Sequence, residues 1–260
     1  FKYLKEECSI EGQALAESFA YYDVLASQSN ENGTFFSIGD YKDLFTKKIF
    51  SHNLYQGFLR PIIFLIGEIV SLLVEYNSLK ASFDLPECDK FEVVSTIIER
   101  ANGLDKDIQF TKLDGSYLKR IKSEEEEEVE EHLTLFELYQ LSAQIYVRQV
   151  IKKLPPIVPE IEVLFFALKQ DLQMLVKAKR LKNILGFPML IAGVSAVTKE
   201  DRDDVTDLFN RMIQTCGYMS GYQKLWIVIK QIWEINKNGA FCVDWFDITK
   251  EMGWKLNLGR

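Results

Sequence analysis

Hydrophobic residues recur at helical spacing along most of the chain, and the alternation that marks β-strands hardly occurs. Spacing of i, i+3 and i+4 places the apolar side chains on one face of each expected helix. The stripes run through residues 15–26, 41–45, 62–76, 91–101, 139–150, 161–176, 205–216 and 225–233, and a short helix starts near Asp244. The pattern predicts an all-α fold, a bundle-like single domain of about nine or ten helices around an apolar core.

Turn and capping residues divide these stripes. Pro61 fits the first turn of the buried helix that follows it, and Asn102-Gly103 fits the end of the stripe before it. Residues 104–132 are mixed in character and contain five consecutive glutamates, so we expect a flexible acidic loop that runs into the next helix. Thr198 followed by Asp201 has the spacing of a capping box.

The most apolar stretch, residues 61–76, predicts a buried core helix and no membrane span. Gly67 and Glu68 interrupt its apolar run, which falls short of the ~20 residues that a span requires. Apolar residues on both sides of this helix indicate that most of its surface is covered.

Length and charge narrow the class of protein. The 260 residues fit one large domain or two small ones, and the first residue, Phe1, indicates a piece cut from a longer protein. The formal net charge of -7 argues against a nucleic-acid interface in this piece, because contact with phosphates requires clustered Lys and Arg. If the parent protein touches DNA, we expect another region to do so.

The cysteines and histidines do not have the spacing of a metal site. Four cysteines lie far apart without a CxxC pair, and only two histidines occur, His52 and His132. Both histidines follow loop-like segments, so we expect them to face solvent. The sequence therefore predicts no metal ligands, with buried free thiols in a reducing compartment.

Signatures of catalysis are missing from the sequence. It contains no G-x-G-x-x-G, G-x-x-x-x-G-K-[ST], H-E-x-x-H or G-x-S-x-G. The stretch "FPMLIAGVSAV" places Ala192, Gly193 and Ala196 within an apolar run, and it lacks the second glycine of a nucleophile elbow. We interpret it as a small-residue strip where another helix approaches closely, and we expect no catalytic residues and no enzyme.

Three stretches together resemble a known family. "FPMLIAGVSAVTKEDRDDV", then "LFNRMIQTCGYMSGYQKLWIVIKQIWEINKNG" and "DWFDITKEMGW", are similar to the C-terminal end of the fungal-specific transcription factor domain. "FAYYDVLASQS" and "GFLRPIIFLIGEIVSLLVEY" resemble upstream segments of the same domain, so the likeness spans residues 13 to 260. The matched positions near the C-terminus are Pro188, Leu190, Ala192, Gly193, Ala196, Ile229, Trp233, Asp244 and Trp245.

The resemblance implies a nuclear helical regulatory domain of a zinc binuclear-cluster transcription factor that controls metabolic genes. It implies a small-molecule effector, an amino-acid, nitrogen or sterol metabolite, together with transcriptional co-regulators and a homodimer as further partners. Zinc and DNA contact are then expected in a missing N-terminal cluster of six cysteines, which the four cysteines here do not supply.

Candidate ligand-binding residues are Arg60, Tyr139, Tyr146 and Arg148, because a pocket between helices is mostly apolar with a few polar groups. Each has an ordinary structural interpretation as well: an Arg paired with acids, or a Tyr packed in the core. An interaction or dimerisation scaffold without a small ligand, such as a co-regulator dock or a centromere-type subunit, stays open as the alternative. An unrecognised helical enzyme is the third. Trp245 and Trp254 are expected core anchors, so truncation from Asp244 onward should disrupt folding and regulation.

Overall fold

The computed structural model describes residues 10–45, 54–81, 87–113, 126–178, 184–216, 221–256 and 258. Within these ranges the chain forms ten α-helices, one short 3-10 helix and no strand, which confirms the all-α prediction. The elements are α2 (Ile10–Ala26), η1 (Ser27–Ser29), α3 (Ile38–Phe45), α4 (Leu54–Ala81), α5 (Glu87–Phe110), α7 (Glu126–Val150), α8 (Pro159–Leu175), α9 (Gly186–Ser195), α10 (Lys199–Cys216), α11 (Gly221–Ile235) and α12 (Trp245–Glu251). The organisation of residues 1–260 as one domain stays a prediction.

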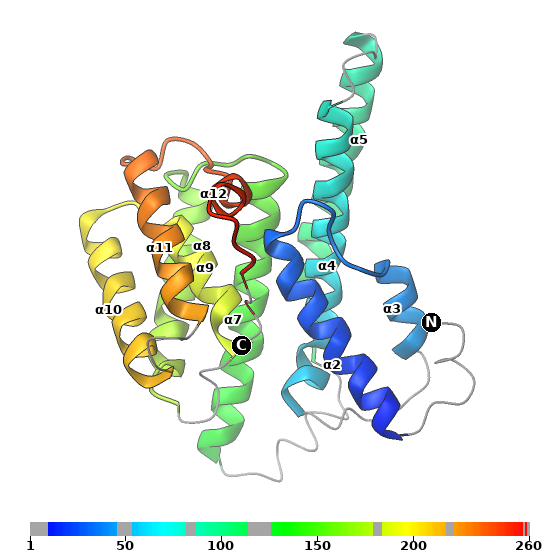
Figure 1. The fold of residues 1–260 in the computed structure, drawn as a ribbon. Coiled ribbons are helices and arrows are strands. Elements are labelled where there is room, and N and C mark those ends of the chain that lie inside the picture. The colour runs from blue at the N-terminus through cyan, green and yellow to red at the C-terminus, as the bar shows by residue number, and fades with distance from the viewer. Residues whose placement is uncertain are drawn as a thin grey trace.

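Helix α7 is the central element of the fold. It packs against α4 and α5 on one side and against α8 and α9 on the other (Figure 1). Helices α10 and α11 pack on α9, and α12 returns from α11 to contact η1 at the end of α2. The C-terminal segment therefore connects the two groups of helices that flank α7.

Helix α4 supplies much of the core, and its start differs from the prediction. Pro61 lies inside the helix, which begins at Leu54, and not in its first turn. A proline at this position cannot donate the backbone hydrogen bond to the residue four positions earlier. By length and composition the Gly57–Leu79 stretch could cross a membrane, yet 61% of its most apolar window is buried among the other helices, as in a core helix.

Helix α5 continues through the expected stop at Asn102-Gly103. Its buried face is formed by Ile97, Ala101 and Ile108, whereas Phe91 at the start of the predicted stripe is 78% exposed. The last part of α4 and the first part of α5 project together from the body of the molecule (Figure 1), and Phe91 and Val94 of α5 are exposed there.

The expected loop at 104–132 is wrong at both ends. Residues 104–110 belong to α5 and residues 126–132 to α7, while residues 114–125 lie outside the described residues. Arg148 of α7 and Lys152, which follows the end of α7, both donate to Asp105, at 2.9 and 2.7 Å, and these charge-assisted bonds fix α5 along the end of α7. The prediction that the helix ends at Asn102-Gly103 used local residues only and could not include this contact between distant helices.

Two predicted exposures are also corrected. His132, expected to face solvent, is 3% exposed, and its ring centroid lies 5.4 Å from that of Phe58 on α4. Leu15 and Phe19, expected on the buried stripe of α2, are exposed, and Ala20, Val24 and Leu25 form the buried face. His52 lies outside the described residues.

Candidate functional site

The small-residue strip of α9 is a helix crossing in the core. All ten residues of α9 are buried. A Cβ added to Gly193 would lie 2.2 Å from Cδ1 of Ile229 on α11, so only glycine permits this approach. Trp233 Nε1 of α11 donates to the Gly193 carbonyl at 2.8 Å. The structure thus confirms the predicted close approach, and Ser195 at the end of the strip accepts a hydrogen bond from Gln149 Nε2 at 3.2 Å.

A small cavity lies beside this crossing. It is partly open and is lined by Leu73 of α4, the end of α7, α9, the end of α11 and the segment 242–246 at the start of α12. The lining residues are Leu73, Gln149, Val150, Lys153, Pro156, Val194, Ile232, Asn236, Cys242, Val243, Asp244, Trp245 and Phe246. Its volume of about 30 Å³ is enough for one or two water molecules.

Amide and thiol groups give the cavity polar points within an apolar wall. Asn236, 4% exposed, donates through Nδ2 to the Phe241 carbonyl, while its Oδ1 is buried without a hydrogen-bond partner in the part of the chain that the structure describes. Cys242 Sγ contacts the Leu154 carbonyl at 3.1 Å, and burial raises the pKa of this thiol to about 11. Cys242 is therefore a neutral donor, and Asn236 Oδ1 is a buried acceptor without a partner among the described residues.

Lys153 brings a cation to the cavity from an unfavourable backbone position. Its φ of 55° is in the left-handed region, where glycine or asparagine is preferred after a helix end. The ammonium lies 5.8 Å from the centroid of the Tyr76 ring. A lysine at this φ costs backbone energy that glycine would avoid.

Segment 242–246, which covers one side of the cavity, also connects the helices around α9 and α11 to η1 at the end of α2. Asp244 Oδ1 accepts from Phe246 N at 2.9 Å and caps α12, as its place in the sequence predicts. Trp245 is 2% exposed, and its Nε1 donates to the Gln28 carbonyl in η1 at 2.8 Å. A shift of segment 242–246 would therefore alter the hydrogen bond between Trp245 and Gln28 at the end of α2.

The four predicted ligand residues lie in three places, and none of them is among the residues lining this cavity. Arg60 lies inside α4 and forms an ion pair with Glu17 of α2. Arg148 pairs with Asp105 of α5. These two arginines have the ordinary structural role of joining helices, and a ligand role for them stays a prediction.

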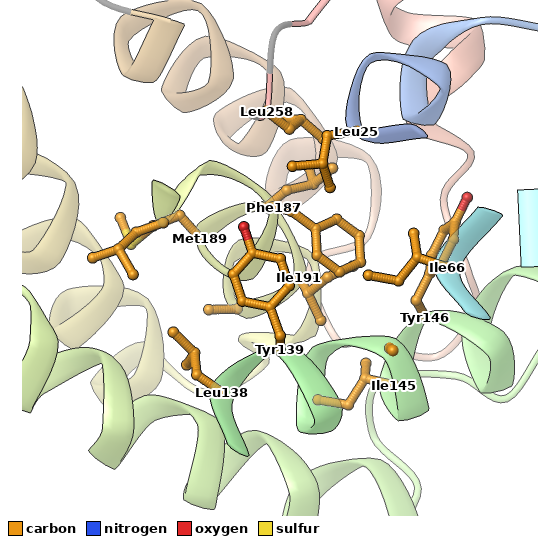
Figure 2. Close-up of a cluster of buried hydrophobic side chains, with 14 of the residues drawn as sticks. Leu25, Ile66, Leu138, Tyr139, Ile145, Tyr146, Phe187, Met189, Ile191 and Leu258 are labelled. Carbon is orange, nitrogen blue, oxygen red and sulfur yellow. The ribbon is translucent and has the colours of Figure 1, made fainter. Parts of the chain in front are cut away.

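Tyr139 and Tyr146 lie on either side of Phe187 in the core (Figure 2), with ring centroids 6.1 and 5.7 Å from it. Tyr139 Oη donates to the Ile184 carbonyl at 2.6 Å. The Tyr146 ring also contacts Trp245, at 5.8 Å between centroids, and burial raises the pKa of its hydroxyl, which has no hydrogen-bond partner among the described residues. Tyr146 therefore contacts the cavity indirectly, because its neighbour Trp245 is one of the lining residues.

Sequence reasoning did not find Gln149, Lys153, Asn236 or Asp244 as neighbours. One signal existed for Gln149, because residues 146, 149 and 150 follow helical spacing and share a face of α7, whereas Lys153 lies beyond the end of that helix. No pattern in the sequence indicates that residues of α11 and the 242–246 segment meet this face. Among the described residues, no group of three or more His, Cys, Asp or Glu side chains is placed to hold a metal ion.

Comparison with known proteins gives two matches. The family model for the fungal specific transcription factor domain matches residues 3–259. An uncharacterized transcriptional regulatory protein of Schizosaccharomyces pombe is 38% identical over 266 aligned positions. That alignment covers 100% of this chain and 47% of the relative, so the chain spans about half the length of the relative that it matches. No solved structure matches the chain.

Proposed function

The chain belongs to the fungal-specific transcription factor domain family, and from this premise we propose that it is an effector-sensing regulatory domain that controls metabolic genes. Membership gives it a role in transcription regulation, implies a nuclear role and suggests a regulator that is not an enzyme. Contact with DNA, through a zinc cluster of six cysteines, belongs in this proposal to another part of the parent protein.

The roofed cavity carries the effector proposal. Its volume of about 30 Å³ is far below the ~300 Å³ of a small ligand pocket, so a metabolite would have to displace the 242–246 segment. Because Trp245 is bonded to Gln28 in η1, this displacement would alter the contact between α12 and the end of α2. Occupation of the cavity would thereby change a surface remote from it, as a regulatory domain requires.

The lining favours a small polar effector over a sterol. Lys153 supplies a cation and Asp244 a carboxylate, and Gln149 and Asn236 add amide groups to walls of valine, isoleucine and tryptophan. A molecule with both a carboxylate and an ammonium group, such as an amino acid, would complement this set. A sterol would leave these charged and amide groups without partners.

A thermal-shift screen tests the proposal, with amino acids, their pathway intermediates, polyamines and sterols as probes. A ligand at about 100 times its Kd should stabilise the native state by about 2.7 kcal/mol. We expect a saturable shift for amino acids or related intermediates. A flat panel with a well-folded protein would instead favour the interaction scaffold, and a shift from sterols alone would contradict the polar-effector assignment.

Lys153→Gly separates ligand binding from folding in this screen. Glycine accepts a φ of 55° without strain, which offsets the lost contact with Tyr76, so the melting temperature should change little. The ligand-induced shift should fall sharply. Lys230→Ala is the matched control, because it removes a cation 5.7 Å from the Trp226 ring without touching the cavity lining.

The link between the cavity and the end of α2 can be tested by removing the C-terminal segment from Asp244 onward, which contains Trp245. Truncation from Asp244 onward, or Trp245→Ala, should lower the melting temperature and disrupt reporter regulation, since a buried tryptophan contributes ~3–5 kcal/mol. Trp245→Phe should retain most of the packing and lose only the hydrogen bond to Gln28. A truncated protein with an unchanged melting temperature and unchanged reporter output would refute the role of this C-terminal segment in folding and regulation.

A further inference from the structure

Three Asn-Gly pairs occur in the chain, at residues 32–33, 102–103 and 238–239. An asparagine before glycine can lose its side-chain amide, because the glycine nitrogen can attack the asparagine Cγ with no side chain on the glycine to obstruct it. All three asparagine side chains are exposed, so the dipeptide and its exposure do not rank the three sites. The hydrogen bonding of the attacking glycine nitrogen differs among them.

The glycine nitrogen is engaged in the first two pairs. Gly33 N donates to the Asn30 carbonyl at 3.0 Å. Gly103 lies inside α5, where the backbone N–H groups are bonded within the helix. Attack by either nitrogen requires its hydrogen bond to break, and for Gly103 it also requires local unfolding of the helix. The fold therefore protects Asn32 and Asn102.

The third pair is held in a different way. Gly239 follows the end of α11, and its nitrogen donates no hydrogen bond within the part of the chain that the structure describes. The Asn238 side chain is turned toward the following backbone, because its Oδ1 accepts from Ala240 N at 3.3 Å. This N–H group lies where negative charge develops on Oδ1 as a nucleophile adds to Cγ, so it stabilises that charge. The attacking nitrogen is thus available and the attacked carbonyl is polarised.

We propose that Asn238 is a site of spontaneous deamidation, in contrast to Asn32 and Asn102. Gly239 N bonds to Asn238 Cγ, and the side-chain amide leaves as ammonia, which takes up the proton lost from the glycine nitrogen. Water then opens the resulting succinimide at one of its two carbonyls and yields aspartate or isoaspartate. In isoaspartate the chain runs through Cβ and Cγ, so the backbone contains one additional methylene group.

The additional backbone atom falls where the fold has little room. The Gly239 carbonyl accepts from Ile157 N at 3.2 Å, and a Cβ added to Gly239 would lie 2.6 Å from Cγ2 of Val197. Glycine is also favoured here by its φ of 70°. Isoaspartate at position 238 therefore displaces Gly239 from these contacts and loosens the turn that follows Asn236. The reaction needs no effector and is independent of the effector-sensing function.

Peptide mapping after incubation measures the three rates. The full chain is kept in mildly alkaline buffer, digested briefly with trypsin under mildly acidic conditions and analysed by mass spectrometry. Trypsin cleaves after lysine and arginine and places the three pairs in separate peptides, residues 6–42, 101–106 and 238–250. In the native protein, we expect Asn238 to deamidate at least about tenfold faster than Asn32 and Asn102.

The same measurement in denaturant is the control for sequence effects. With the hydrogen bonds lost, the three rates should agree within about threefold. Native rates that are equal at the three sites, or highest at Asn32 or Asn102, would overturn the proposal. A preference for Asn238 that is as large in denaturant as in the native protein would also overturn it, because the fold would then have no part in the selection.

Variants of Asn238 separate the new charge from the altered backbone. Asn238→Gln should stop the reaction at this site, because glutamine would have to close a larger ring, and its melting temperature should not fall on incubation. Asn238→Asp supplies the charge with a normal backbone, so it should melt close to the fresh native protein.

The incubated native protein should melt at a lower temperature as its isoaspartate content rises. Asn32→Gln is the matched control, because it removes a protected Asn-Gly pair and should leave this loss unchanged. An incubated protein that carries isoaspartate at position 238 and melts like the fresh protein would overturn the displacement of Gly239.

Discussion

Helices α8 and α9 are both rich in apolar residues, and the fold treats them in opposite ways. Every residue of α9 is buried, and its glycine permits contact with α11. In α8 the adjacent Phe165 and Phe166 are 5% and 58% exposed. The difference arises from position, because α9 is covered by α7, α8, α10 and α11, whereas α8 lies at the edge and has described neighbours on one side only.

The comparison separates residues that stabilise the fold from residues that are available for binding. An apolar side chain in α9 contributes transfer and packing energy to folding. An exposed apolar side chain on α8 contributes little to folding, and its burial energy becomes available when a partner covers it. The same residue type therefore has different consequences on the two helices.

The phenylalanine pair of α8 gives the largest expected contrast. Phe165→Ala should lower the free energy of unfolding by about 3 kcal/mol, because it leaves a core cavity and removes the ring that lies 5.6 Å from Lys169 Nζ. Phe166→Ala should change it by no more than about 0.5 kcal/mol. Urea unfolding measures both, and equal effects of the two substitutions would contradict the division of α8 into a core face and a free face.

The crossing of α9 and α11 predicts an intermediate effect. Gly193→Ala should cost about 2 kcal/mol, because the new Cβ meets Ile229 Cδ1. Ile229→Val removes that atom, so the double variant should recover part of the loss instead of adding to it. Thermal or urea unfolding of the two single variants and the double variant measures this coupling, and strictly additive losses would show that the two residues do not meet.

Substitution of Asp171 should give the smallest change in the free energy of unfolding, and this change should depend on pH. Its pKa of about 7 in the folded state is above the 3.8 of an ordinary aspartate, so the folded state holds the proton more tightly than the unfolded state. Stability should therefore fall as the pH rises from about 4 to 7. Asp171→Asn should stabilise the protein at pH 8 by about 1 kcal/mol, a value reduced for the half-exposed position, and by less at pH 5.

Urea unfolding at the two pH values checks this dependence. Gln170→Asn is the control, because it alters a neighbouring exposed side chain that carries no titratable group. A stability difference between Asp171→Asn and the native protein that is the same at pH 5 and pH 8 would show that the Asp171 carboxyl is not perturbed by its surroundings.

Much of the fold is predictable from local patterns. The stripes of α10 and α11 are buried where the sequence predicts, and Asp201 N donates to Thr198 Oγ1 at 3.1 Å as the capping box requires. Predictions that used turn residues as stop signals were less successful, as at Pro61 and Asn102-Gly103, because contacts with distant helices override local preference.

The residues of the candidate site, by contrast, were not predictable from local patterns. The sequence indicates ligand residues by type, and it nominated Arg60 and Arg148, whose charges pair with Glu17 and Asp105. Residues lining the cavity come from five separated parts of the chain, and only those on α7 share a period. Periodicity cannot report which faces meet, so the cavity had no sequence signal beyond α7.

By itself, the sequence determined that the described part of this chain is all-α and that Gly193 marks a close helix crossing, and from the net charge it predicts that DNA contact lies elsewhere. These properties follow from composition and from local backbone geometry, which adjacent residues carry. Only the tertiary structure decided that Phe165 is core while Phe166 is free, and that Lys153, Asn236 and Asp244 line one cavity. Burial and proximity depend on which elements cover each face, and no single segment of sequence holds that information.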